Sequence, residues 1–90
     1  MPTIKFTTAL KRFYPNLQAL EIAGGTVAEL VETINDIYPG IKDYIVDEQG
    51  RLRKHVNIFL GNELIKDRNQ LKDIVKENDE LLIFQALSGG

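Results

Sequence analysis

The chain ends on NDELLIFQALSGG, residues 78–90, in which a polar turn precedes four apolar residues and two glycines close the sequence. The apolar run at 81–84 is typical of a β-strand. Glycine is unfavourable inside strands, so we expect the strand to end before Gly89. Two interpretations of the residues beyond it are open. They form a frayed chain end, as is common, or they present a terminal carboxylate that is itself the working group.

Side-chain alternation gives this last strand two apolar faces. A period of two places Leu81 and Ile83 on one side and Leu82 and Phe84 on the other. If the first pair faces a helix, the second pair lies on an uncovered sheet face.

The predicted strand at 55–60 repeats this pattern, with Val56 and Ile58 on one side and Phe59 on the other. Phe59, Leu82 and Phe84 are therefore expected to form an apolar cluster that docks a partner. The alternative is that a loop covers this cluster or that sheet twist buries part of it.

A strongly amphipathic helix is predicted from Thr26 to the Pro39-Gly40 pair, which ends it. Thr26 and Glu29 have the spacing of a capping box, in which each residue satisfies a backbone N–H of the other. The apolar positions follow one helix face and are Val27, Leu30, Val31, Ile34, Ile37 and Tyr38.

Shorter segments complete the pattern. Strands are predicted at 3–8 and 17–22, and a brief strand at 64–65. The segment at 41–46 is expected to form one turn under the sheet, and residues 69–73 are expected to form a single helical turn. The residues expected to be buried in these segments are Ile4, Phe6, Leu20, Ile22, Leu71, Ile74 and Val75.

The order of elements is strand, strand, helix, strand, short strand, last strand. This order predicts an α+β fold, a mixed sheet with one main helix packed on one face. The first and last strands are expected to lie side by side and parallel. We expect a single domain, residues 1–90, with a flexible C-terminal tail at 86–90.

Composition narrows the function. Hydrophobic residues make up 43% and charged residues 27% of the 90 residues, values of an ordinary globular domain. There is no cysteine, no apolar run of about 20 residues and no signal-peptide pattern, so cytoplasm is the default expectation. A formal charge of −2 gives no general attraction to nucleic acid or to anionic membranes. The basic cluster at 51–55 is interpreted as a solvated loop.

No catalytic or metal-binding constellation is visible. The single histidine, His55, has no cysteine or second histidine to share a metal, and no metal site is predicted. The Gly24-Gly25 pair lacks the lysine of a phosphate-binding loop, so it is interpreted as a turn into the helix. With no other reactive constellation in the chain, the terminal carboxylate stays open as the working group, beside the alternative of a frayed chain end.

The chain resembles the ubiquitin-like sulfur carriers of the MoaD/ThiS family. The residues that carry the resemblance are the tail at 86–90, the turn and strand start at 77–81, and the strand segment at 56–59, together with the order of elements. The resemblance covers the whole chain and implies a β-grasp, or ubiquitin-like, fold.

The resemblance also implies a mechanism. An E1-like enzyme would use its own ATP and magnesium to adenylate the carboxylate of Gly90, and a sulfur donor would convert the adenylate to a thiocarboxylate. Leu87, Ser88 and Gly89 would thread into that enzyme, and Phe59, Leu82 and Phe84 would dock the folded body. The chain itself would be a protein cosubstrate, not an enzyme, and would bind no cofactor.

The sulfur acceptor implied by the family is the large subunit of molybdopterin synthase or a PLP-dependent cysteine synthase. Gln85-Ala86 stands where the molybdopterin carriers usually have prolines, a departure from that branch. Two other functions remain open: a ubiquitin-like modifier joined through Gly90 to lysines, and a non-catalytic β-grasp binding module.

Overall fold

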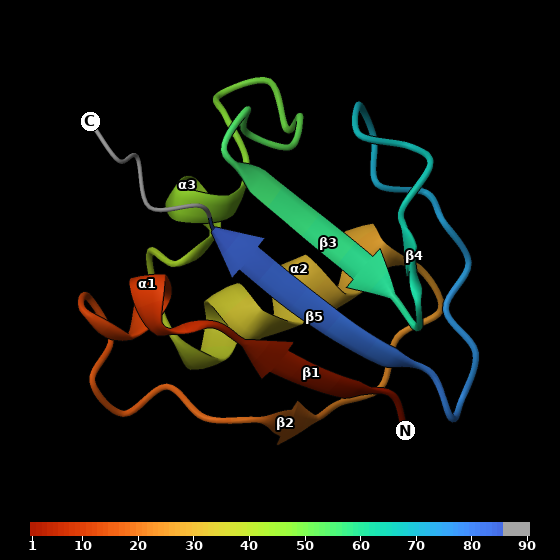
Figure 1. The fold of residues 1–90 in the computed structure, drawn as a ribbon, viewed down its shortest axis with the longest axis horizontal. Coiled ribbons are helices and arrows are strands. Elements are labelled where there is room, and N and C mark those ends of the chain that lie inside the picture. The colour runs from red at the N-terminus through yellow and green to blue at the C-terminus, as the bar shows by residue number, and fades with distance from the viewer. Residues whose placement is uncertain (86–90) are drawn as a thin grey trace.

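The computed structural model describes residues 1–85, and the tail predicted at 86–90 lies outside the described residues (Figure 1). A mixed sheet of five strands runs through the molecule in the order β2-β1-β5-β3-β4. The strands are β1 (Thr3–Phe6), β2 (Leu20–Glu21), β3 (Val56–Leu60), β4 (Glu63–Leu64) and β5 (Glu80–Gln85). The helices are α1 (Thr8–Lys11), α2 (Val27–Ile37) and α3 (Lys42–Ile45).

Strand β5 occupies the centre of the sheet. It pairs in parallel with β1, with Ile4 opposite Leu81, and antiparallel with β3, with Ile58 opposite Ile83. The first and last strands are thus neighbours and parallel, as predicted. The pairing with β1 extends to Ile83 and the pairing with β3 continues to Gln85, so the path of β5 is fixed along its length.

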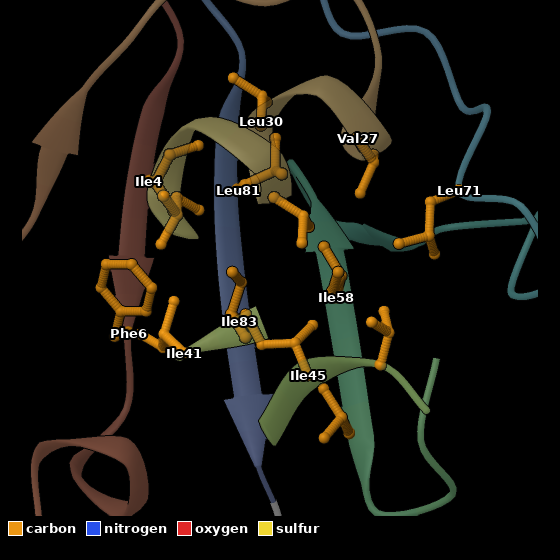
Figure 2. Packing of buried hydrophobic residues seen from close by; sticks show 14 of the residues in the cluster. Ile4, Phe6, Val27, Leu30, Ile41, Ile45, Ile58, Leu71, Leu81 and Ile83 are labelled. Atoms are coloured by element: carbon orange, nitrogen blue, oxygen red, sulfur yellow. The ribbon is translucent and has the colours of Figure 1, made fainter. Parts of the chain in front are cut away.

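The core lies between the sheet and the two helices α2 and α3. Leu81 and Ile83 project from β5 into it and are fully buried, beside Ile58 and Leu30 (Figure 2). The predicted alternation of β5 is confirmed, since Leu82 and Phe84 lie on the opposite side with partial exposure.

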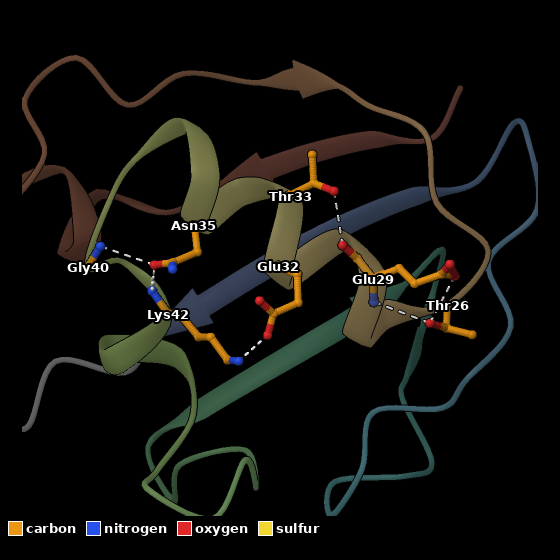
Figure 3. A network of polar contacts seen from close by, with 7 residues as sticks. All are labelled: Thr26, Glu29, Glu32, Thr33, Asn35, Gly40 and Lys42. Carbon is orange, nitrogen blue, oxygen red and sulfur yellow. Dashed lines mark hydrogen bonds and ion pairs between the residues drawn. The ribbon is translucent and has the colours of Figure 1, made fainter.

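The start of α2 has every early backbone N–H satisfied. The Thr26 hydroxyl accepts from Glu29 N–H at 3.2 Å, as the capping box predicts (Figure 3). The Glu29 carboxylate, however, accepts from Gly25 N–H at 3.0 Å. Backbone carbonyls of Asp73 and Leu71 accept from the first two N–H groups of the helix. The loop before β5 is therefore tied to the helix that covers β5.

The end of α2 is closed by one side chain. Asn35 Oδ1 accepts from Gly40 N–H at 3.0 Å and from Lys42 N–H at 3.1 Å, and Gly40 has a φ of +93° (Figure 3). The chain consequently turns straight into α3, where Ile41 and Ile45 are fully buried under the sheet. The predicted turn at 41–46 is confirmed.

Several shorter predictions differ from the structure. Strand β1 ends at Phe6, and α1 follows at once and buries Leu10. Strand β2 is limited to two residues; Leu17 is buried, and Leu20 is partly buried against the core. The hairpin connection therefore contains a helix. Ile74, predicted to be buried, is 70% exposed, and Ile37 at the end of α2 is 46% exposed.

A carboxylate network replaces the helical turn suggested near 69–73. Asp67 accepts from the backbone N–H groups of Asn69, Gln70 and Lys72, and Asp73 accepts from those of residues 66 and 67. The turn carries Leu71 into the core with a φ of +55°, a conformation that side chains rarely adopt. The hydrogen bonds to the two carboxylates offset that strain.

We predict that Ile83→Ala lowers the free energy of unfolding by about 2–5 kcal/mol, because it leaves a cavity in the buried centre of the sheet. The measurement is urea unfolding followed by circular dichroism. Phe84→Ala, one residue later but 39% exposed, is the matched control and should cost much less. Equal losses for both variants would contradict the assignment of the two faces.

We predict that Asp67→Asn makes the stability less sensitive to acid. The backbone N–H of Gln70, followed by those of Lys72 and Asn69, lowers the pKa of the Asp67 carboxyl against the opposing effect of its burial. A lowered pKa stabilises the fold above the unfolded value, about 3.9, and this contribution is lost as pH falls through the folded value. Urea titrations across that range should show the difference between wild type and variant shrinking as pH falls; a constant difference would refute the prediction.

Candidate functional site

One face of the sheet carries no helix in the described part of the chain. Helices α2 and α3 lie behind the sheet in Figure 1, and the face toward the viewer is open. Phe59, Leu82 and Phe84 lie on this open face, opposite to the buried side chains of the same strands, as the alternation predicted. No described loop covers Phe84, which is 39% exposed.

The strand register brings these side chains together. Phe59 lies directly opposite Leu82 on one side and opposite Leu64 on the other, and Phe84 follows two residues after Leu82. Directly opposed residues have their Cβ atoms about 5 Å apart on the same face, so the four side chains form one surface. We call Leu64, Phe59, Leu82 and Phe84 the apolar row.

Leu64, which is 51% exposed in the structure, was not among the docking residues predicted from the sequence. Its segment was predicted as a brief strand, but a two-residue strand shows no alternation from which a face can be assigned. The pairing of β4 with β3 assigns it. The pattern that could have revealed it is the Gly61-Asn62 turn, which folds Leu64 back onto Phe59.

A charged border closes one end of the apolar row. Lys5 lies opposite Leu82 on β1 and makes an ion pair with Glu80, two residues before Leu82 on the same face. Both side chains are about half exposed, so the pair contributes little to stability. The Lys5–Glu80 ion pair marks the edge of the apolar surface.

The open face ends where β5 ends. Gln85 is the last described residue and pairs with Val56 at the start of β3. Its side-chain oxygen is shielded from solvent and accepts no hydrogen bond from the described residues. The predicted threading residues Leu87, Ser88 and Gly89 and the predicted reactive residue Gly90 lie outside the described residues.

Residues 1–85 contain no candidate metal site and no membrane-spanning helix, and their one histidine is exposed. No group of three or more histidine and acidic side chains that could hold a metal ion occurs there. His55 stands in an exposed loop just before β3. No helix in this range is long and apolar enough to cross a membrane.

Comparison with known proteins finds a matching family model and similar curated proteins. The model of the ThiS family matches residues 4–90. The sulfur carrier protein CysO of Mycobacterium bovis and that of Mycobacterium tuberculosis are each 23% identical over 90 residues, covering 98% of this chain and 97% of theirs.

Solved structures agree with this match. A chain of the Amycolatopsis orientalis BexX/CysO complex aligns over 100% of both chains with a TM-score of 0.85 and 28% identity. The small archaeal modifier protein 1 of Methanosarcina acetivorans aligns over 99% of this chain and 95% of its own, with a TM-score of 0.76 and 25% identity. The predicted β-grasp, ubiquitin-like fold is thereby confirmed.

Proposed function

The chain belongs to the ThiS family, and we propose that it is a sulfur carrier protein whose reactive group is the carboxylate of Gly90. One observation carries the proposal: the central strand β5, fixed on both edges, runs into a sequence that ends on two glycines. A rigid body with a short glycine-ended extension suits a group that must reach into another protein's active site. Glycine has no side chain to clash in a narrow channel.

The chemistry follows from the low reactivity of a carboxylate. An E1-like enzyme that binds ATP and magnesium would let a Gly90 oxygen attack the α-phosphorus, releasing pyrophosphate and forming an acyl-adenylate. A sulfur nucleophile from a donor would then attack the carbonyl carbon and expel AMP, leaving a thiocarboxylate. ATP and magnesium belong to the enzyme in this scheme, and the chain is its protein cosubstrate in the cytoplasm.

The names of the relatives favour one acceptor over another. The curated relatives are called sulfur carrier protein CysO, which favours delivery of sulfur to a PLP-dependent cysteine synthase. There the thiocarboxylate sulfur would bond to the β-carbon of an activated serine, whose activated oxygen leaves. The large subunit of molybdopterin synthase is the weaker choice, since Gln85-Ala86 stands where prolines are usual.

The apolar row is the proposed docking surface for these enzymes. It lies on the sheet face that α2 and α3 leave open, and it leads along β5 toward the tail. A partner that covers Phe84 and Leu64 therefore has the tail entering beside it. Aromatic side chains at the centre of an interface supply much of its affinity.

A second function, conjugation through Gly90 to lysines of other proteins, is favoured by the likeness to the Methanosarcina acetivorans modifier protein. Both functions need adenylation of Gly90, and they separate at the next step. Sulfur attack gives a thiocarboxylate, whereas lysine attack gives an amide bond.

We predict that co-expression with its E1-like enzyme and a sulfur source converts the chain to a thiocarboxylate. Intact mass spectrometry should show a mass gain equal to the replacement of one oxygen by sulfur. Deletion of Gly89-Gly90 should abolish the gain, because the remaining Ser88 cannot reach the reacting nucleotide in the same conformation.

Each other outcome favours a different function. Conjugates with a branched Gly-Gly on lysine, without the sulfur product, would favour the modifier. If the deletion left all partner binding intact and no sulfur product ever formed, the chain would be a binding module whose tail takes no part in its function.

We predict that Phe84→Ala raises the KM of the activating enzyme for the carrier about tenfold, the effect of losing about 1.4 kcal/mol of docking energy, with kcat unchanged. Leu64→Ala should act in the same direction. Ile74→Ala is the matched control, since Ile74 is an exposed apolar residue that pairs with Thr26 at the start of α2 and not with β3 or β5. A fall in kcat with an unchanged KM would contradict a docking role.

A further inference from the structure

A basic hollow lies at the same end of the sheet as Gln85. Four cationic side chains, His55 and one carboxylate line an open depression of about 640 Å³. The cations are Arg51, Arg53, Lys54 and Arg68. The whole chain carries a formal charge of −2, so this concentration of positive charge is local.

The charge of Arg68 is fixed in place. Its guanidinium donates to Asn57 Oδ1 at 2.9 Å, to the Arg53 carbonyl at 2.8 Å and to the Val56 carbonyl at 3.0 Å. These carbonyls belong to the segment that enters β3. Because the side chain is already ordered, a partner that meets it loses little further conformational entropy.

The remaining cations are held less tightly around this fixed charge. Arg53 Nε donates to the Asp43 carbonyl at 2.8 Å, which fixes its direction, while the Lys54 ammonium makes no ion pair within residues 1–85. Arg51 lies beside Asp47 at 3.7 Å. Asp47 is itself occupied, since its carboxylate accepts from the backbone N–H groups of Gln49 and Arg51.

The hollow is continuous with the apolar row. Asn57, which accepts from Arg68, lies directly opposite Phe84 on the open face. Val56, whose carbonyl also accepts from Arg68, lies opposite Gln85. The apolar row, the end of β5 and the basic hollow therefore form one surface.

We propose that the basic hollow is the charged rim of the docking surface and binds an acidic patch of the enzyme that takes the tail. Interfaces commonly combine an apolar centre with a polar rim. Complementary charge at a rim speeds association and fixes orientation more than it adds affinity. Here it would orient the carrier so that the chain beyond Gln85 points at the entry of the tail channel. This inference rests on the proposed function.

The test is the steady-state kinetics of the E1-like enzyme with charge-reversal variants of the carrier. We expect Lys54→Glu to raise the KM for the carrier about three- to tenfold at low salt, with kcat unchanged. Arg51→Glu/Lys54→Glu should raise it further. Lys76→Glu, the same charge change in the turn before β5, at the strand's other end, is the matched control and should match wild type.

Salt supplies a second readout. At about 1 M salt the Debye length falls to about 3 Å, so the difference between Lys54→Glu and wild type should largely disappear. Thermal unfolding of all variants checks that the fold is intact. A loss that persists at high salt would show that the change acts by shape and would overturn the inference.

The outcomes separate this inference from the proposed function. If wild type is not adenylated, the proposed function fails and the inference falls with it. If wild type is adenylated and Lys54→Glu matches Lys76→Glu, the inference alone is wrong. It is equally wrong if the enzyme kinetics are unchanged and wild type, but not the double variant, binds a labelled single-stranded RNA.

Discussion

The pairing of β5 on both edges is the constraint on which the other features of the molecule depend. Hydrogen bonds to β1 on one side and β3 on the other fix its register, and a shift of one residue would expose Leu81 and Ile83 and bury Leu82 and Phe84. Such a shift would replace the two fully buried side chains, which fit the core, by a leucine and a larger phenylalanine. The register therefore decides which residues form the core, which form the apolar row and where the strand ends.

This arrangement lets one strand meet two requirements that usually conflict. A docking surface needs exposed apolar side chains, but exposed apolar side chains invite aggregation. In β5 the buried residues stabilise the strand enough for the intervening residues to stay exposed, and the Lys5–Glu80 pair sets a charged limit beside them. The loop before β5 adds to the rigidity, because the carbonyls of Leu71 and Asp73 cap the first turn of α2.

The fold could be predicted from the sequence because its decisive signals are local. Alternation along 80–85, the amphipathic pattern of α2 and the Thr26 cap each specify an element without knowledge of distant contacts. The errors arose where tertiary contacts decide. Leu71 enters the core through a backbone conformation whose strain the hydrogen bonds of Asp67 and Asp73 offset, and Ile74 is left outside by the same turn. Leu64 and the basic hollow depend on pairing across the sheet, so a loop interpreted as solvated proves to border the open face.

The length of the chain beyond Gln85 separates docking from chemistry. In the proposed function, five fully extended residues would carry the Gly90 carboxylate up to about 17 Å from the end of β5. The contacts proposed for the apolar row and the basic hollow would be the same whether the carboxylate is free or adenylated. They can therefore contribute uniform binding only, which lowers KM without raising kcat. In the proposed function, acceleration of the acyl transfer would come from the activating enzyme, while the apolar row and the basic hollow would bind the carrier and set its orientation.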